Sequence, residues 1–430
     1  MPSERYPEAD LMIAPSERLE HATVAVLKNA AAGLPGTERW VTGAVRKTPL
    51  LIHDINGQPL FYDFEVASGQ EVFGNVRVAA SKVLGLGAVA AELGPRSWSF
   101  DAAVKKLAPK ARRELGRATT PAPKLVCYSY PKLGVMYETE TEKGRSRAIY
   151  DVASLARVPE KPGGRETEGF YAWSYYDSLS DDERRQRLAR YSKAEKDLTS
   201  LSVALRRDIA AARALGPLLN KMPLKFSQNV NKLLQYCTHY GHTHARSHHC
   251  FVLHGQQVND YCAVATCQMI LCYYRYYYSQ ARIAPDLNYT AGNGCPPDQS
   301  PGYKSLSCKH LDASFDAAPT WEKGRDQIDL LRPFKSGIPG HARACAGYSY
   351  VRWIFGGAIT DKKLYIYDPW PPNADYAQGG AVTWEDWNAV THTNYVYANI
   401  NCPGASGAEV GSRSARPRAR VRRPVDAGVA

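Results

Sequence analysis

Residues 254–280 read HGQQVNDYCAVATCQMILCYYRYYYSQ and carry the strongest local signal in the chain. A turn-forming segment ends at Tyr261, and residues 263–278 contain neither Gly nor Pro, which predicts a helix that begins at Cys262. The dipole and free N–H groups at a helix N-terminus favour a thiolate, which is the nucleophilic form of cysteine. Gln256 precedes Cys262 by six residues. Its side-chain amide can therefore join the Cys262 backbone N–H in an oxyanion hole.

A nucleophilic cysteine needs a base that a third group orients. His341 follows the turn 337–340, and Asp368 ends the alternating run 364–368 before a proline. We expect two antiparallel strands that place His341 beside Asp368. The same block offers substitutes for the base, the acid and Gln256, which are His392, Asp386 and Gln257.

Three motifs in this block carry a family resemblance. They are GQQ-x3-YCAVATCQMIL (255–271), SGIPGHARACAGY (336–348) and LYIYDPWP (364–371). In the order Gln, Cys, His, Asp they resemble the papain-superfamily cysteine peptidases related to the bacteriocin-processing, double-glycine leader peptidases. The resemblance spans residues 255–401 and includes WEDWNAVTHTNYVY (384–397).

The resemblance implies an α+β, papain-like domain in which a helical half carries the cysteine and an antiparallel β half carries the histidine and the acid. It implies that Cys262 is the nucleophile, His341 the general base and acid, and Asp368 the group that orients the imidazole. Gln256 and the Cys262 backbone N–H would form the oxyanion hole. The chain departs from many relatives at Ala263, where they have Gly or Trp, and this leaves the local backbone geometry open.

Upstream, short alternating runs predict a separate β-rich α+β module. Residues 50–54 and 60–66 flank Asn56-Gly57 and predict a hairpin, because Asn-Gly accepts the positive φ of a tight turn. Further strands and one helix are predicted at 72–79, 125–130, 134–140 and 147–152, and at 98–115. The module loosely resembles cystatin- or PepSY-like propeptide modules, which implies that residues 1–235 could cover the active-site cleft and keep an enzyme latent.

The chain therefore divides into five predicted regions. Ser180 and Glu183 form a capping box, followed by an amphipathic pattern that predicts one long helix from about 181 to 215. The regions are an N-terminal arm (1–40), the propeptide-like module (41–157), a linker with the long helix (158–235), the papain-like domain (236–402) and a disordered basic tail (403–430).

Composition narrows the class of protein and its partners. Lys and Arg number 54 against 42 Asp and Glu, a net charge of +12 that is partly concentrated in the Arg-rich tail. No aromatic-interleaved basic patch accompanies it, so we expect no nucleic-acid partner. No apolar run approaches the ~20 residues of a membrane span, and the first residues show no secretory signal. The compartment stays open: it is cytoplasmic by default, but the crowded cysteines are compatible with secretion.

Cysteine and histidine are concentrated in the second half. Nine of the ten cysteines lie between 237 and 402, and CTHYGHTHARSHHC (237–250) holds five histidines. Its spacing fits no standard zinc finger, so a Cys237–Cys250 disulfide or a solvated loop is favoured over a metal site. Cys295, Cys308, Cys345 and Cys402 could also form disulfides, and the run YYRYYY (273–278) is more typical of packing than of a substrate groove. We expect no cofactor and no metal.

The sequence thus predicts a cysteine peptidase that hydrolyses a peptide or protein substrate through an acyl-enzyme intermediate. Two alternatives remain open. The same triad supports acyl transfer or amidase chemistry on other scaffolds, and an unreactive Cys262 would leave a non-catalytic peptide-binding module.

Overall fold

The computed structural model of the chain describes residues 9–116, 122–141, 144–160, 167–193, 195, 214–219, 227–234, 251–353 and 359–400. The predictions for the His-rich stretch 237–250 and for the tail 403–430 lie outside these residues, as does most of the helix expected beyond residue 193. No helix among the described residues combines the length and apolar character that a bilayer crossing requires.

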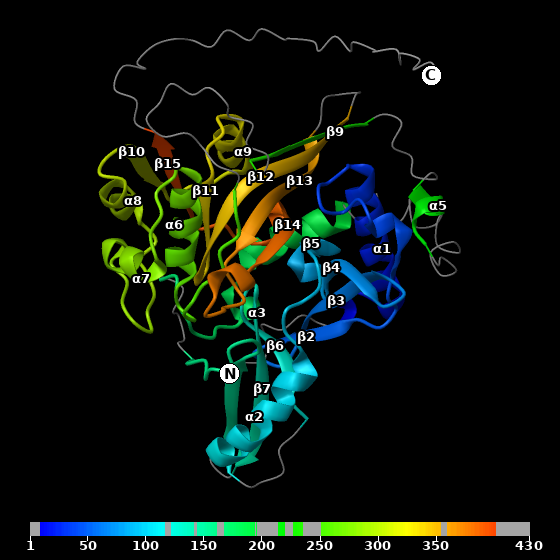
Figure 1. Ribbon diagram of the computed structural model, residues 1–430. Coiled ribbons are helices and arrows are strands. Elements are labelled where there is room, and N and C mark those ends of the chain that lie inside the picture. Colours follow the sequence, from blue (N-terminus) through cyan, green and yellow to red (C-terminus); the bar gives the residue numbers. More distant parts are fainter. Residues whose placement is uncertain are drawn as a thin grey trace, which may run out of the picture.

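One large sheet organises the molecule. The fifteen strands of the described residues belong to it, in the order β10-β15-β11-β12-β13-β14-β5-β4-β3-β2-β6-β7-β8, with β1 beside β3 and β9 beside β12. The pairs are antiparallel except β2 with β6, which run parallel. The fold is α+β, as expected, with a mixed sheet (Figure 1).

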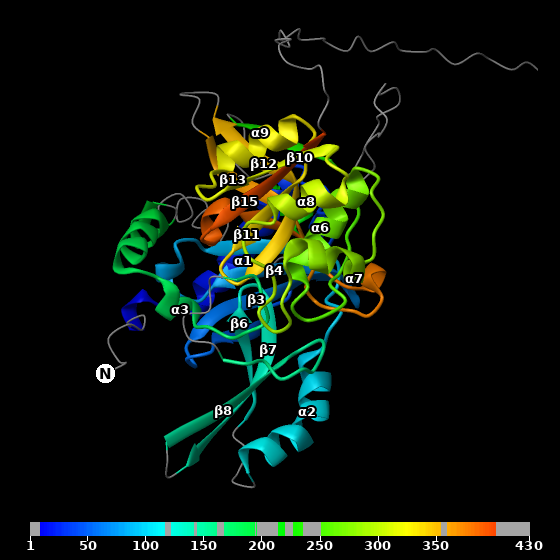
Figure 2. The ribbon, with the colours of Figure 1, turned by 90° about the vertical axis from the view of Figure 1, so that its left-hand side faces the viewer.

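The strands and the helix predicted between residues 50 and 152 are present. The hairpin pairs Leu50 with Asp63, and Gly57 in its turn has φ +91°, the positive value that the Asn-Gly signal predicts. Figure 2 shows β7, β8 and α2 extending away from the rest of the molecule. The elements of this half are η1 (Ala9–Leu11), α1 (Pro15–Ala31), η2 (Trp40–Thr42), β1 (Ala44–Val45), β2 (Leu50–Asp54), β3 (Pro59–Ser68), β4 (Glu71–Ala79), η3 (Lys82–Leu84), β5 (Ala88–Leu93), α2 (Phe100–Leu115), β6 (Lys124–Ser129), β7 (Lys132–Thr141) and β8 (Gly144–Asp151).

β3 carries a buried carboxylate. Asp63 is 3% exposed. Arg77 on β4 donates to its two carboxylate oxygens at 3.0 Å each. Burial of a carboxylate is tolerated when a charged, bidentate partner accompanies it.

The second half places a short buried helix against the sheet. α6 ends at Tyr273, before the end of the Gly- and Pro-free run, and Arg275 there has φ +64°. The elements are α3 (Tyr175–Ser178), α5 (Gly216–Leu219), β9 (Ser227–Leu233), α6 (Cys262–Tyr273), α7 (Gln280–Ile283), η4 (Ala284–Leu287), α8 (Ser300–Leu306), β10 (Leu311–Asp316), α9 (Trp321–Asp329), β11 (Phe334–Ile338), β12 (His341–Trp353), β13 (Ile359–Asp368), η5 (Tyr376–Gln378), β14 (Ala381–Asp386), η6 (Trp387–Ala389) and β15 (Asn394–Ile400).

The helix predicted after the linker begins where its capping box lies. Glu183 N–H donates to Ser180 Oγ at 3.2 Å, and Ser180 N–H donates to the Glu183 carboxylate at 2.9 Å. Residues 181–193 are helical. The start of the helix is therefore confirmed, and its expected extent to residue 215 stays a prediction.

Strand pairing joins the two halves. β5 lies beside β14 in antiparallel register, with Ala91 opposite Trp384. Trp384 is buried, and its indole N–H donates to Pro35 O at 3.0 Å. The expected N-terminal module and the expected papain-like domain therefore share one continuous sheet.

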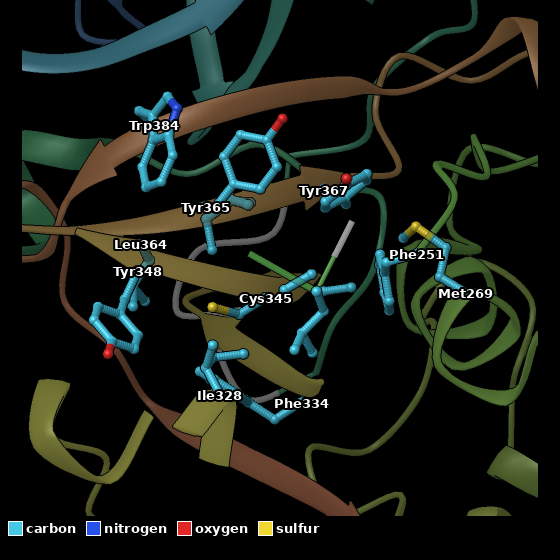
Figure 3. Packing of buried hydrophobic residues seen from close by; sticks show 14 of the residues in the cluster. Phe251, Met269, Ile328, Phe334, Cys345, Tyr348, Leu364, Tyr365, Tyr367 and Trp384 are labelled. Carbon is cyan, nitrogen blue, oxygen red and sulfur yellow. The ribbon is translucent and has the colours of Figure 1, made fainter. Parts of the chain in front are cut away.

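A hydrophobic core lies where α6 packs on the central strands. Figure 3 shows Met269 of α6 and Phe251 near Tyr367 of β13, and the Phe251 and Tyr367 rings lie 4.9 Å apart. In the YYRYYY run, Tyr273, Tyr274 and Tyr276 are buried whereas Tyr277 is exposed. The run therefore packs, as expected. α6 is predominantly apolar, and all of its residues except Cys272 are buried, as is typical of a helix inside a core.

Candidate active site

Cys262 is the first residue of α6 and is fully buried. The helix packs on β12, and the backbone N–H of Ala342 hydrogen-bonds the Cys262 sulfur. The thiol donates to the carbonyl oxygen of Glu168 at 3.6 Å. The sulfur thus lies between a helix N-terminus, the start of β12 and an upstream segment of the same chain.

Burial raises the pKa of the Cys262 thiol above its ordinary value, and the Glu168 carboxylate adds to that shift. The Lys132 ammonium and the Ala342 N–H act in the opposite direction without cancelling it. Desolvation disfavours the charged form of any acid. Cys262 in this closed arrangement is therefore a thiol.

His341 and Asp368 lie side by side, as the motif order predicts. β12 and β13 are antiparallel, and His341 Nε2 lies 2.8 Å from Asp368 Oδ1. The same oxygen accepts the Trp370 backbone N–H at 2.8 Å. The other imidazole nitrogen, Nδ1, is buried and has no hydrogen-bond partner among the described residues. One nitrogen is thus oriented by the acid, and the second is left for a reacting group.

Burial lowers the pKa of His341 to about 4, and the nearby Lys132 ammonium lowers it further. Asp368 opposes the shift through its charge and its hydrogen bond, but the desolvation of a fully buried imidazole is larger. His341 is therefore neutral near pH 7, like the Cys262 thiol.

Gln256 is buried before the helix, but its amide is engaged. Nε2 donates to Val258 O at 3.0 Å and to Asn259 O at 2.6 Å. Its backbone N–H donates to the carbonyl oxygen of Pro369, the residue directly after Asp368, at 2.9 Å. Gln256 thus links the loop before Cys262 to the end of β13, with both amide hydrogens directed at backbone carbonyls.

The three substitutes lie in other surroundings. Gln257 has an exposed side chain that donates to Ala374 O at 2.8 Å. His392 stacks on Trp387 with ring centroids 3.7 Å apart. Asp386 caps η6 by accepting the Asn388 N–H at 2.8 Å. Each has a structural role in the described residues, whereas His341 and Asp368 pair with one another.

Two residues near the thiol were not predicted. Lys132, at the start of β7, is fully buried and donates to Gly169 O at 2.7 Å and to Gly340 O at 3.2 Å. Glu168 supplies the carbonyl at the sulfur. A single lysine after a proline and a single glutamate in a charged linker give no sequence signal for such positions.

The cysteines in the described residues are all free thiols: Cys127, Cys262, Cys267, Cys272, Cys295, Cys308 and Cys345. No group of three or more His, Cys, Asp or Glu among the described residues could hold a metal ion. The Cys237–Cys250 pair lies outside them, as does Cys402.

No family model and no curated protein matches the chain. Among solved structures, it is similar to a double-glycine-motif protease from an AMS/PCAT transporter in complex with the leader peptide, at 14% identity, 36% of this chain, 96% of that chain and a TM-score of 0.26. It is also similar to the peptidase domain of Streptococcus ComA, a bifunctional ABC transporter, at 18% identity over 35% of this chain and 99% of that chain, with a TM-score of 0.25. A third similar structure is UfSP from C. elegans, at 14% identity over 41% of this chain and 38% of that chain, with a TM-score of 0.26.

Proposed function

We propose that the chain is a cysteine peptidase that is latent in the arrangement described here. The observation that carries the proposal is a buried thiol at a helix N-terminus whose sulfur contacts Glu168 O and the N–H of Ala342. Ala342 directly follows His341, which pairs with Asp368 and whose second imidazole nitrogen has no partner among the described residues. A nucleophile, an oriented base and a bound carbonyl are the parts that acyl transfer from a peptide requires.

In the proposed reaction, His341 Nδ1 takes the proton of Cys262, and the thiolate attacks the carbonyl carbon of the substrate. His341 then protonates the leaving amine as the C–N bond breaks, and water hydrolyses the thioester. Asp368 holds Nε2 and stabilises the imidazolium. The Cys262 backbone N–H supplies one oxyanion donor. For Gln256 to supply the second, its amide must turn from Val258 O or Asn259 O.

Latency follows from the same burial that shifts both pKa values. The thiol pKa is raised and the imidazole pKa is lowered mainly by desolvation, so the thiolate–imidazolium pair is disfavoured while residues 167–169 cover the sulfur. Admitting water and substrate removes the common cause of both shifts. We therefore expect activity to require displacement of the segment.

The test uses a chain in which that segment is displaced. Gly294→Ala would place a Cβ 1.8 Å from Glu168 O. In this background, a peptidyl vinyl sulfone should modify Cys262, as read by mass spectrometry of the digested protein. His341→Gln should slow the reaction by at least about tenfold, a lower bound for loss of a general base.

The matched control is His392→Gln, a partly buried histidine of the same region that stacks on Trp387, and it should leave the rate unchanged. Equal rates in all three chains, or modification that does not prefer Cys262, would contradict the proposal. Hydrolysis of a peptide library by the Gly294→Ala chain, lost in Cys262→Ser, would complete the case for peptidase activity.

A further inference from the structure

Glu168 forms an isolated antiparallel bridge with Cys295 beside the thiol. Glu168 N–H donates to Cys295 O at 3.1 Å, and Cys295 N–H donates to Glu168 O at 3.3 Å, which is the reciprocal pattern of an antiparallel pair. The carbonyl that faces Cys262 thus belongs to the Glu168–Gly169 peptide. Lys132 holds the next carbonyl, that of Gly169, at 2.7 Å.

The side chain of Glu168 is buried beside the thiol, with 3% of it exposed. Its carboxylate forms an ion pair with Lys335, which is fully buried on β11. The second oxygen accepts Gln299 Nε2 at 2.6 Å. A buried carboxylate is thus met by one charged and one neutral donor, the pairing that such burial requires.

Both donors to the Glu168 carboxylate, Lys335 and Gln299, also bind other oxygens. Lys335 Nζ also donates to Pro297 O and to Asn394 Oδ1, each at 2.8 Å, and Gln299 Nε2 donates to Pro296 O at 2.7 Å. These partners all belong to the region after Cys262, so the donors are held in place by their own surroundings. None of these oxygens carries the negative charge that would neutralise the Lys335 ammonium, however.

Among the residues that the structure describes, Glu168 is the one carboxylate within ion-pair distance of Lys335. Without it, a buried ammonium would have only neutral oxygens around it, which is costly in a low-dielectric interior. Lys335 and Gln299 are therefore suited to bind an anionic side chain supplied by another segment or by a ligand.

The position after Glu168 has room for glycine alone. A Cβ on Gly169 would lie 2.6 Å from the backbone oxygen of Asn293 and 2.9 Å from the Tyr171 ring. A backbone atom cannot move aside as a flexible side chain can. A peptide that follows this path is therefore selected at two successive positions. The first requires an acidic side chain, and the second admits only glycine.

We propose that Lys335 and Gln299 form a subsite for the glutamate of a Glu–Gly sequence in peptide substrates, and that Glu168 fills this subsite within the chain. The inference rests on the proposed peptidase function. It identifies the substrate class as peptides with an acidic residue at the carbonyl that Cys262 attacks. It also makes Glu168–Gly169 a substrate-like segment that competes with such peptides.

The experiment compares two peptidyl vinyl sulfones that differ only in Glu or Gln at the residue next to the warhead. In full-length Glu168→Gln, the segment has lost its charge and Lys335 lacks a counter-ion. Labelling of Cys262 by the Glu probe should be at least about tenfold faster than in the wild type and at least about tenfold faster than labelling by the Gln probe, as expected for one charge-assisted contact.

Adding Lys335→Met to Glu168→Gln should remove the preference by slowing the Glu probe while leaving the Gln probe unchanged. If this double variant does not fold, as judged by its thermal transition, Gln299→Met in the same background should reduce the preference instead. Glu160→Gln is the matched control, because Glu160 belongs to the same linker but pairs with Arg147; it should behave as the wild type.

The outcomes separate the two proposals. Equal labelling by both probes in Glu168→Gln, with a rate that still depends on His341, would overturn the subsite and leave the peptidase function standing. Absence of Cys262 labelling by either probe in every folded variant would overturn both.

Discussion

Cys262 has a raised pKa in a protein where a nucleophile is expected to have a lowered one, and the cause is its burial beneath Glu168. A raised pKa means a smaller thiolate fraction at any given pH. We therefore expect alkylation of Cys262 by iodoacetamide in the wild type to be slow at pH 7 and to rise only above the ordinary thiol pKa of ~8.5. In Gly294→Ala the midpoint should move to lower pH, because water reaches the sulfur. Peptide mass spectrometry over a pH series measures both.

Cys308 provides an internal reference for that series, since it is an exposed free thiol of the same chain. Wild-type alkylation of Cys262 as fast as that of Cys308 at pH 7 would contradict the closed arrangement. An identical pH profile in the wild type and Gly294→Ala would show that Glu168 does not set the thiol pKa.

A separate prediction concerns the effect of substituting Asp368 on hydrolysis. Asp368→Asn keeps an oxygen that can accept the Trp370 N–H but removes the charge that favours an imidazolium. We expect hydrolysis in the Gly294→Ala background to fall by about a hundredfold or more, within the range for general acid–base catalysis, with little change in the melting temperature. Asp386→Asn is the control, because an amide oxygen can still cap η6. The reverse result would assign the acid to Asp386.

At this scale the sequence indicated Cys262, His341 and Asp368 through motif order, and the structure brings His341 and Asp368 together as expected. Their catalytic roles stay predictions. Lys132 and Glu168 could not be anticipated, because their positions depend on strands that pair far along the chain. The engaged amide of Gln256 was not foreseen for the same reason, since it depends on the local path of the loop after it.

At the scale of elements, the loop 290–294 offers a matched pair of substitutions. Gly292 and Gly294 both have positive φ, at +81° and +75°, so alanine at either position has the same kind of backbone strain, about 1 kcal/mol. A Cβ on Gly292 meets nothing within 4 Å, whereas one on Gly294 would lie 1.8 Å from Glu168 O. Only Gly294→Ala should release the segment over the thiol.

The expected readout is faster hydrogen exchange at the Glu168 and Cys295 amides in Gly294→Ala, together with faster Cys262 alkylation. Gly292→Ala should match the wild type in both, and its melting temperature should fall less than that of Gly294→Ala, which also loses the buried Glu168–Lys335 ion pair. Faster Cys262 alkylation in both variants would mean that loop strain, and not the contact with Glu168, controls access.

Most helices and strands could be predicted from the local sequence pattern. The hairpin at Asn56-Gly57, the strands to residue 152, α2 and the capping box at Ser180 are present as predicted, because each depends on residues close together in sequence. α6 ends earlier than its composition predicts. Arg275 adopts a left-handed conformation, although the sequence has no glycine or asparagine there that would predict one. The positions of the following tyrosines depend on tertiary packing.

For the molecule as a whole, the pairing of β5 with β14 could not be predicted from the sequence. Each strand is recognisable by alternation, but neither pattern says which edge the other will join. The pairing makes the N-terminal half part of the sheet that carries His341 and Asp368. If residues 1–235 act as a propeptide-like module, this module is held by main-chain hydrogen bonds as well as by the segment at the thiol.

A cut between the halves tests what that continuity implies. A site-specific protease sequence introduced within residues 235–250 leaves β9 on the N-terminal piece and its partner β12 on the other. β5 and β14 are divided in the same way. We expect the cut chain to elute as one species in size-exclusion chromatography, with Cys262 alkylation as slow as in the uncut protein, because these pairings and the Glu168 ion pair remain intact.

Trp384→Ala should change that outcome. Trp384 is buried at the junction opposite Ala91, and its truncation should cost about 3–5 kcal/mol, the usual range for a large aromatic in a core. In the uncut chain the pieces are tethered, so the loss should appear as a lower melting temperature. In the cut chain it should appear as dissociation and faster Cys262 alkylation. Release of residues 1–235 from the cut chain without this substitution would show that the strand pairing does not hold the module, and that proteolysis alone can activate the enzyme.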